Sequence, residues 1–327
     1  MADEQRMPID AGIDIGGTNT VIGLFDSQRN LLAKTTIPTF LSASPEREWT
    51  NNPEAFYERL HEAIVKLAES IGGSGCLAKV GIGVPGQVDT TCGIVIRASN
   101  MRWHDVPLAA AMRGRLGVPV KIENDVRAYT LGEALAGAGQ GFRNIVCLTL
   151  GTGLAAGIIA DGRLIRGGAW HAGEIGHDPV PGVAYRCNCG KTGCLETVAS
   201  ATGIARIAKD AVHAGETTTL AQGGNPEQLT AHEVFQACLQ GDAVALGVFR
   251  QVATMLGQKL LSAIYLLNPD IVIIGGGVAA AGEILLSPIR AVLEDGYFSK
   301  TACPQICIGT LGDSAGLLGA VHLFDIS

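Results

Sequence analysis

Hydrophobic and polar positions alternate along the chain in patterns that predict short strands and longer helices. Residues 12–26 (GIDIGGTNTVIGLFD) carry apolar residues on both sides of a glycine pair, which predicts a β-hairpin that bends at Gly16-Gly17. Residues 53–71 have apolar side chains at helical spacing, which predicts an amphipathic helix. The strand VGIGVPGQVD then turns at Pro85-Gly86, and the strand VPVKIEND runs into a helix predicted over 126–136.

The same pattern restarts at residue 145. Residues 145–165 (IVCLTLGTGLAAGIIADGRLI) again predict strand, glycine turn and strand, so the two halves are expected to share one plan. Helices are predicted over 200–214 and 243–267, followed by the strand DIVIIGGGV and a final helix from Ser314. Strands that alternate with helices indicate an α/β fold with mostly buried sheets.

We therefore expect two α/β domains with a cleft between them. The smaller domain is predicted over residues 1–121, with a C-terminal helix over 314–327 returning to it. The larger domain is predicted over 122–313, and a hinge is expected near residues 122–130. A chain of 327 residues is long enough for two domains of ordinary size.

Composition narrows the classes of protein to be considered. The chain is 47% hydrophobic and 17% charged, as expected of a well-packed globular protein, and its 44 glycines favour many tight turns. A net charge of -7 makes nucleic acid an unexpected partner. Residues 1–9 are polar and do not resemble a signal peptide, and the apolar run 271–282 is too short to span a bilayer. Most of the nine cysteines stand singly among apolar residues, so we expect a cytoplasmic protein without a membrane partner.

Three glycine turns follow apolar strands in the sequences IDIGGTNT, LTLGTGLAAG and IVIIGGGV. Their glycines let backbone N–H groups come close to a phosphate, so together the turns favour a nucleotide site. Each turn taken alone is equally well explained as a tight bend. None of them matches the Walker A loop or the dinucleotide fingerprint.

Two aspartates are candidates for phosphoryl-transfer chemistry. Asp14 lies in an apolar strand just before the first glycine turn, where a carboxylate is costly unless it is near a cation, so we interpret it as an outer-shell Mg²⁺ ligand. The alternative is a cap or turn aspartate. Asp125 lies where a strand gives way to a helix, and it is either the helix N-cap or a general base that accepts a hydroxyl proton.

The segment HAGEIGHDPVPGVAYRCNCGKTGCLE predicts a metal site. Cys187, Cys189 and Cys194 form a Cys-x-Cys-x4-Cys run, and His177 precedes it. Three thiolates and one imidazole are typical of structural, tetrahedral zinc. Reduced loop cysteines and a catalytic zinc are the alternatives, and His171 is a spare candidate ligand.

Glu174 and Glu196 flank this zinc loop. Two carboxylates held there are able to bind several hydroxyls of a polyol, because carboxylates accept short charge-assisted hydrogen bonds. Both residues are equally consistent with solvated surface glutamates.

The sequence resembles the ROK family of bacterial sugar kinases and repressors, and most closely its glucokinase branch. The motifs that carry the resemblance lie between Gly12 and Gly319, namely GIDIGGTNT, GIGVPGQVD, SNMRW, VKIENDVRA, LTLGTGLAAGII, GEIGH, CNCGKTGCLE and DIVIIGGGV. The resemblance implies a two-domain, actin-like ATPase (ribonuclease H-like) fold with ATP and sugar in the cleft.

The resemblance also implies roles for individual residues. The first phosphate turn would comprise Asp14, Gly16, Gly17 and Thr18, the second Gly151, Thr152 and Gly153, and the adenosine contact Gly275, Gly276 and Gly277. The sugar would be bound by Gly86, Asn100, Asn124, Asp125, Glu174, His177 and Glu196. Asp125 would be the catalytic base, and His177 would hold zinc with one ring nitrogen and a sugar hydroxyl with the other.

The expected function is transfer of the terminal phosphoryl group of ATP to a hexose, most simply glucose, with Mg²⁺ and structural Zn²⁺ as cofactors. Fructose, mannose, allose and N-acylated amino sugars are alternative acceptors, and polyphosphate is an alternative donor. A sugar-responsive repressor is disfavoured because only eleven residues precede Gly12. A non-catalytic sugar sensor and a zinc hydrolase are further alternatives. The family resemblance implies a homodimer or homotetramer.

Overall fold

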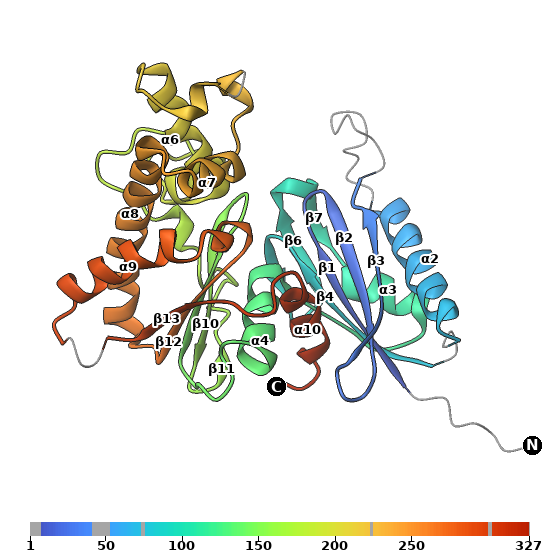
Figure 1. The fold of residues 1–327 in the computed structure, drawn as a ribbon. Helices are drawn as coiled ribbons and strands as arrows, with labels where there is room; N and C mark the ends of the chain where they lie inside the picture. Colours follow the sequence, from blue (N-terminus) through green and yellow to red (C-terminus); the bar gives the residue numbers. More distant parts are fainter. Residues whose placement is uncertain (1–7, 41–52, 73–75, 223–224, 300–302, 327) are drawn as a thin grey trace, which may run out of the picture. The chain divides into compact units, whose positions relative to one another are not determined.

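The structure, a computed structural model, describes residues 8–40, 53–72, 76–222, 225–299 and 303–326 (Figure 1). These residues form two compact α/β units. The first contains the described residues of 1–141, 166–171 and 313–327, and the second contains those of 142–165 and 172–312. The first unit thus extends past the expected boundary at residue 121, because helix α4 (Asp125–Ala136) packs against helix α10 (Ser314–His322).

The first unit is built on a five-stranded sheet in the order β3-β2-β1-β4-β8. Its strands are β1 (Ile9–Ile15), β2 (Asn19–Phe25), β3 (Leu31–Pro38), β4 (Leu77–Val84) and β8 (Val120–Asn124). Helices α2 (Glu54–Ser70) and α3 (Leu108–Leu116) cover one face, and α4 and α10 cover the other (Figure 1). A smaller sheet contains β5 (Gln87–Asp89), β6 (Ile94–Ala98) and β7 (Trp103–Val106).

The second unit repeats the strand order in a sheet β11-β10-β9-β12-β13. Its strands are β9 (Ile145–Leu150), β10 (Leu154–Ala160), β11 (Arg163–Leu164), β12 (Ile271–Gly275) and β13 (Gln305–Ile308). Its helices are α5 (Glu196–Ala199), α6 (Ala201–His213), α7 (Ala231–Leu239), α8 (Ala243–Leu267) and α9 (Glu283–Gly296). In both sheets a three-stranded antiparallel part is followed by two parallel strands, which agrees with the shared plan expected from the two glycine hairpins.

Helix α10 lies unusually close to the backbone of its neighbours. A Cβ atom on Gly81 of β4 would lie 1.8 Å from the carbonyl oxygen of Ala320, and one on Gly319 would lie 1.7 Å from that of Ala128. Only glycine permits this approach, because any side chain would displace the backbone it meets. The glycines therefore let α10 pack directly against both α4 and the sheet of the first unit.

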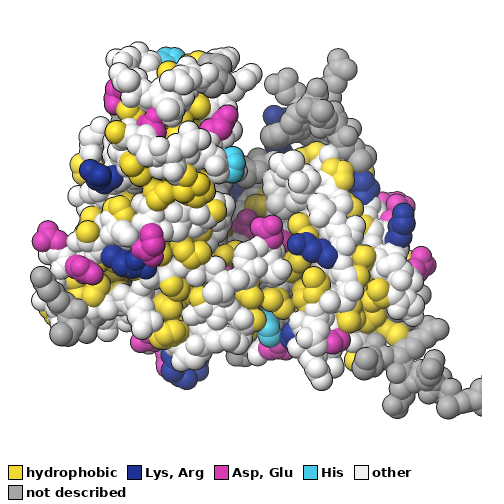
Figure 2. Space-filling view, in the orientation of Figure 1, with side chains coloured by type: hydrophobic (Ala, Val, Ile, Leu, Met, Phe, Trp, Pro, Cys, Tyr) yellow, Lys and Arg dark blue, Asp and Glu magenta, His cyan; other side chains and the backbone are white. Residues whose placement is uncertain are grey.

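Each unit has its own hydrophobic core. One core contains Ile13, Ile82 and Leu60 of the first unit, and the other contains Leu148, Ile274 and Leu256 of the second. On the face shown in Figure 2, side chains of both charges are spread among hydrophobic and uncharged ones. Within the described ranges, none of the helices combines the length and apolar character needed to cross a bilayer.

Candidate active site

The first glycine turn joins β1 to β2 and presents its backbone to solvent. The Gly16 N–H donates to the carbonyl oxygen of Asn19 at 2.9 Å, and Gly17 and Thr18 are exposed. Thr39 holds the turn from the other side, because its hydroxyl donates to the Gly16 carbonyl at 2.8 Å. The turn is thus held by hydrogen bonds while Gly17 and Thr18 stay exposed, which is consistent with the predicted phosphate-binding turn.

Asp14 lies on β1 beneath this turn in a mostly buried, acidic environment. Burial, followed by the negative charges of Asp125 and Asp313, raises the pKa of its carboxyl group to about 7. A Cβ atom on Gly316 would lie 2.7 Å from Asp14 Oδ2, so the first turn of α10 meets this carboxylate directly. Asp14 and Asp125 thus lie close enough to interact electrostatically.

The end of β8 and the start of α4 position Asp125. Asn124, rather than Asp125, caps the helix, because its Oδ1 accepts from the backbone N–H of Arg127 at 3.1 Å. The N-cap interpretation of Asp125 is therefore wrong. Asp125 is the first helical residue, and its Oδ1 accepts from Asn124 Nδ2 at 2.8 Å and from the Val126 N–H at 2.9 Å. A carboxylate here is also stabilised by the positive end of the helix dipole.

The predicted sugar-binding residues of the first unit are only partly brought together. Asn124 Nδ2 also donates to the carbonyl oxygen of Gly86 at 3.1 Å, so these two positions adjoin Asp125. Gly86 has a φ of 96°, and a Cβ atom there would lie 2.2 Å from the carbonyl oxygen of Arg97, so this turn needs glycine. Asn100 is exposed in the short 3-10 helix Ser99–Met101.

In the second unit, two glycine turns lie side by side at the ends of β9 and β12. Gly151 N–H donates to the carbonyl oxygen of Gly153 at 3.0 Å, closing the turn through Thr152. A Cβ atom on Gly276 would lie 2.5 Å from the carbonyl oxygen of Leu150, so the turn Gly275–Gly277 presses on the strand before it. The structure therefore places the predicted second phosphate turn and the predicted adenosine contact next to each other.

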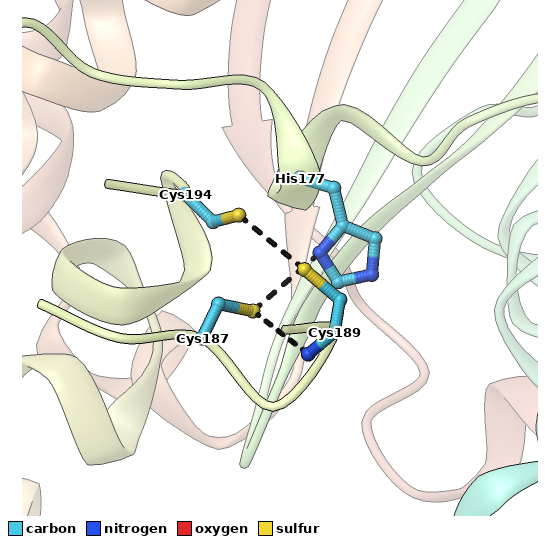
Figure 3. Close-up of side chains that lie close together, drawn as sticks. All are labelled: His177, Cys187, Cys189 and Cys194. Atoms are coloured by element: carbon cyan, nitrogen blue, oxygen red, sulfur yellow. Dashed lines mark hydrogen bonds between the residues drawn. The ribbon is translucent and has the colours of Figure 1, made fainter. Parts of the chain in front are cut away.

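Four side chains of the second unit converge on one point, as Figure 3 shows. The candidate ligand atoms of His177, Cys187, Cys189 and Cys194 all lie within 4.8 Å of one another. His177 Nδ1 lies 3.8 Å from Cys187 Sγ, and Cys189 Sγ lies 3.6 Å from Cys194 Sγ. Tetrahedral zinc with Zn–S bonds of about 2.3 Å needs sulfurs about 3.8 Å apart, so these residues fit the metal.

Burial raises the pKa of the Cys187 thiol to about 12, so a metal bound there must displace a proton. His171, the spare candidate ligand, is not part of this cluster, and it groups with the first unit.

Glu196 and Glu174 extend from the metal cluster in two directions. Glu196 Oε1 lies 3.6 Å from Cys187 Sγ, and its Oε2 accepts from the Leu154 N–H at 3.1 Å beside the predicted second phosphate turn. His177 Nε2 faces Glu174 Oε2 at 3.7 Å, while its Nδ1 faces Cys187. The two ring nitrogens of His177 thus face different partners, one in the cysteine cluster and one outside it. Glu196 is tied into the protein rather than being a free surface carboxylate.

The second unit also contains a cavity of about 570 Å³ that the sequence analysis did not identify. Its lining runs from Thr152 of the predicted second phosphate turn along α6 and includes Thr202, Arg206, Lys209 and His213. These α6 residues recur at helical spacing, and this spacing was the one sequence signal that could have indicated the cavity. A polar helix face, however, more often simply faces solvent. The hydroxyl of Thr202 donates to the Thr152 carbonyl at 3.1 Å and joins the cavity wall to the phosphate turn.

Comparison with known proteins places this arrangement among sugar kinases. The sequence model of the ROK family matches residues 10–326. A glucokinase of Halalkalibacterium halodurans is 38% identical, over 94% of this chain and 92% of that protein. A glucokinase of Thermotoga maritima is 37% identical, over 95% of this chain and 96% of that protein. The crystal structure of a ROK family glucokinase from Streptomyces griseus with glucose and AMPPNP has a TM-score of 0.80 at 34% identity, and the match covers 97% of this chain and 98% of that one.

Proposed function

This chain belongs to the ROK family, and we propose that it is an ATP-dependent hexose kinase whose preferred acceptor is glucose. The observation that carries the proposal is the similarity to two glucokinases, at 38% and 37% identity, over 94% and 95% of the chain. The family match over residues 10–326 includes the glycine turns, Asp125 and the cysteine loop. The neighbour with bound AMPPNP supports ATP as the phosphoryl donor.

In the proposed reaction Asp125 is the general base. Its carboxylate accepts the proton of the attacking 6-hydroxyl as the phosphoryl group arrives, while Asn124 holds the carboxylate through the 2.8 Å hydrogen bond. Gly86, Asn100, Glu174 and Glu196 are proposed to bind the remaining hydroxyls, together with His177. Excluding water from this site would limit wasteful hydrolysis of ATP.

The glycine turns are proposed to hold the nucleotide. Backbone N–H groups of Gly16–Thr18 and Gly151–Gly153 would donate to the phosphates, where charge develops during transfer. Gly275–Gly277 and the cavity along α6 would take the adenosine, because both adjoin the second phosphate turn. A bound Mg²⁺ would neutralise phosphate charge, with Asp14 as an outer-shell ligand.

Zinc is proposed to have a structural role. A bound zinc would have His177, Cys187, Cys189 and Cys194 as its four ligands, and such a set would leave no position for a reactive water, which disfavours a zinc hydrolase. The metal would instead hold His177 and Glu196 in place for the sugar.

We further propose that the two units have the actin-like fold and that the protein forms a homodimer or homotetramer. We also propose a cytoplasmic location, in keeping with nine cysteines that form no disulfide.

The proposed function is tested by ADP release from MgATP with a panel of sugars. We expect glucose to give a higher kcat/KM than fructose, mannose, allose or N-acetylglucosamine, and ATP to be a better donor than polyphosphate. A different preferred sugar would overturn the glucose assignment but not the reaction class. Absence of turnover with every sugar and both donors, in folded protein, would instead favour a sugar sensor.

Metal analysis tests the zinc proposal. We expect about one zinc per chain in the wild type and none in Cys194→Ser, with a melting temperature lower by at least about 5 °C, since structural zinc contributes folding free energy. Cys92→Ser is the matched control, because Cys92 is exposed and lies outside the cluster. Metal-free protein with an unchanged melting temperature would contradict the structural role.

A further inference from the structure

A fully buried carboxylate lies two residues before the proposed base. Glu123, in β8, has no exposed side-chain surface. Its Oε1 accepts from Arg127 Nε at 2.8 Å and from the Asn124 N–H at 2.9 Å, and its Oε2 accepts from Arg166 Nε at 2.6 Å. A buried charge is costly to desolvate unless several donors satisfy it, and here two arginines and a backbone N–H do so.

Arg166 reaches Glu123 from a distant part of the chain. Residues 166–171, here called the strap, group with the first unit although the chain on both sides belongs to the second. Three side chains of the first unit hold the strap. Arg127 Nη1 donates to the Trp170 carbonyl at 3.3 Å, Gln87 Nε2 donates to the Ala169 carbonyl at 2.9 Å, and Glu123 accepts from Arg166.

The backbone of the strap is strained. Trp170 has a φ of 62°, in the left-handed region that bulky side chains rarely adopt. Such a conformation costs about 1–3 kcal/mol, and it persists only where surrounding contacts determine it. The hydrogen bonds from Arg127 and Gln87 to the two adjacent carbonyls are those contacts. The strap is therefore held in one conformation by the residues around Asp125.

The hydrogen bonds around Glu123 extend to Asp125 through a single residue, Asn124. The Asn124 N–H donates to Glu123, the Asn124 side chain accepts from the Arg127 N–H, and Asn124 Nδ2 donates to Asp125 Oδ1. Rotation of Asn124 would thus disturb both its bond to Asp125 and its bond to the Gly86 carbonyl. Just after the strap the chain enters the loop that carries Glu174 and His177.

We propose that Arg166 and Arg127 are positioning residues for the base, acting through Glu123 and Asn124 on the carboxylate of Asp125. The strap is continuous in the chain with the loop that carries the proposed sugar-binding residues Glu174 and His177. When the strap binds to the first unit, it therefore orients the base and also holds the start of that loop in place. This inference rests on the proposed kinase function. It adds Arg166, which lies outside the recognised motifs, and gives Arg127 and Glu123 of the motif VKIENDVRA a role in the reaction.

Arg166→Met tests the proposal. Arg166 lies at the edge of the network, and its side chain is 25% exposed, so the protein is expected to tolerate its loss. Arg127 is less suitable for substitution, because its loss would leave the buried charge of Glu123 without its buried partner. We expect kcat with the preferred sugar to fall about 10- to 100-fold, since small displacements of a catalytic group have effects of that size. The KM for ATP should be unchanged. Arg166→Lys should recover most of the loss, and Arg163→Met, at an exposed position three residues earlier, should match the wild type.

A double-mutant cycle separates positioning from a general structural defect. If Arg166 acts through Asp125, then Arg166→Met should lower kcat by less than about twofold in an Asp125→Asn background. An equal loss in both backgrounds, or wild-type kcat in the single variant, overturns the proposal. Gln87→Leu, which removes one strap hydrogen bond, serves as the second variant if Arg166→Met does not fold, with a smaller fall in kcat and the same non-additivity. Failure of the kinase proposal itself would appear as an inactive wild type.

Discussion

Asp125→Asn is expected to lower kcat about 10²- to 10⁴-fold while leaving glucose binding within a few-fold of the wild type. Asparagine keeps the shape of the side chain, and its Oδ1 can still accept from Asn124 Nδ2 and the Val126 N–H. What it loses is the negative charge that accepts the hydroxyl proton. Loss of that charge at the first turn of α4 costs about 0.3–1 kcal/mol of stability, too little to unfold the chain.

The measurement pairs steady-state ADP release with calorimetric titration of glucose. Asp105→Asn is a suitable control, because Asp105 is exposed on β7 of the same unit and carries no role in the proposed reaction. An Asp125→Asn variant that keeps more than about a third of wild-type kcat would show that another group accepts the proton. Loss of glucose binding together with turnover would instead assign Asp125 a binding role alone.

Local patterns in the sequence were sufficient to predict the strands, turns and loop that carry the candidate site residues. Glycine turns between apolar strands predicted both hairpins, and the Cys-x-Cys-x4-Cys run predicted the cluster that includes His177. Helix α8 has the bounds expected from its periodicity. These signals succeed because neighbours in sequence determine turn geometry, metal-ligand spacing and helix amphipathicity.

The N-cap of α4 is a feature that local sequence preferences alone could not predict. Asn124 and Asp125 are both good N-cap residues, so propensity does not choose between them. The choice depends on Gly86 and Glu123, which accept from the Asn124 side chain and backbone and hold that residue outside the helix. Asn124 is therefore the N-cap, and Asp125 is the first residue of the helix.

Contacts between distant segments were beyond the sequence patterns. The spacing of Glu123 and Arg127 is a recognisable helix-type ion pair, but nothing near Arg166 indicates that it shares the same carboxylate. The expected boundary at residue 121 failed to include α4 in the first unit for the same reason, since its packing partner α10 lies near the other end of the chain. Only the folded chain brings such segments together.

Ionisation of Asp14 is expected to lower the stability of the protein in the absence of ligands. The folded pKa is about 7, raised by burial and by Asp125 and Asp313, against an ordinary value of 3.8. Between these values the folded state keeps a proton that the unfolded chain has released, so stability falls as pH rises from about 4 to 7. The shift corresponds to at most about 4 kcal/mol, and relaxation around the carboxylate reduces that figure.

Asp14→Asn should therefore be more stable than the wild type at pH 8, by about 1–3 kcal/mol, and nearly equal to it at pH 4. Urea denaturation at the two pH values measures this difference. Asp26→Asn is the control of opposite sign, because hydrogen bonds from Asn30 lower the pKa of Asp26 and favour its charged form. A stability gap for Asp14→Asn that does not change with pH would contradict the cause assigned to it.

The same variant should lose activity, about 10- to 100-fold in kcat, as expected for an outer-shell group of a cation site. A nearby cation would offset the repulsion among Asp14, Asp125 and Asp313, so MgATP should raise the melting temperature of the wild type at pH 8 more than that of the variant. If Asp14→Asn were both more stable and fully active, the buried charge would have no function in the reaction. A stabilised but slow enzyme would instead show that the chain retains a costly carboxylate because phosphoryl transfer needs it.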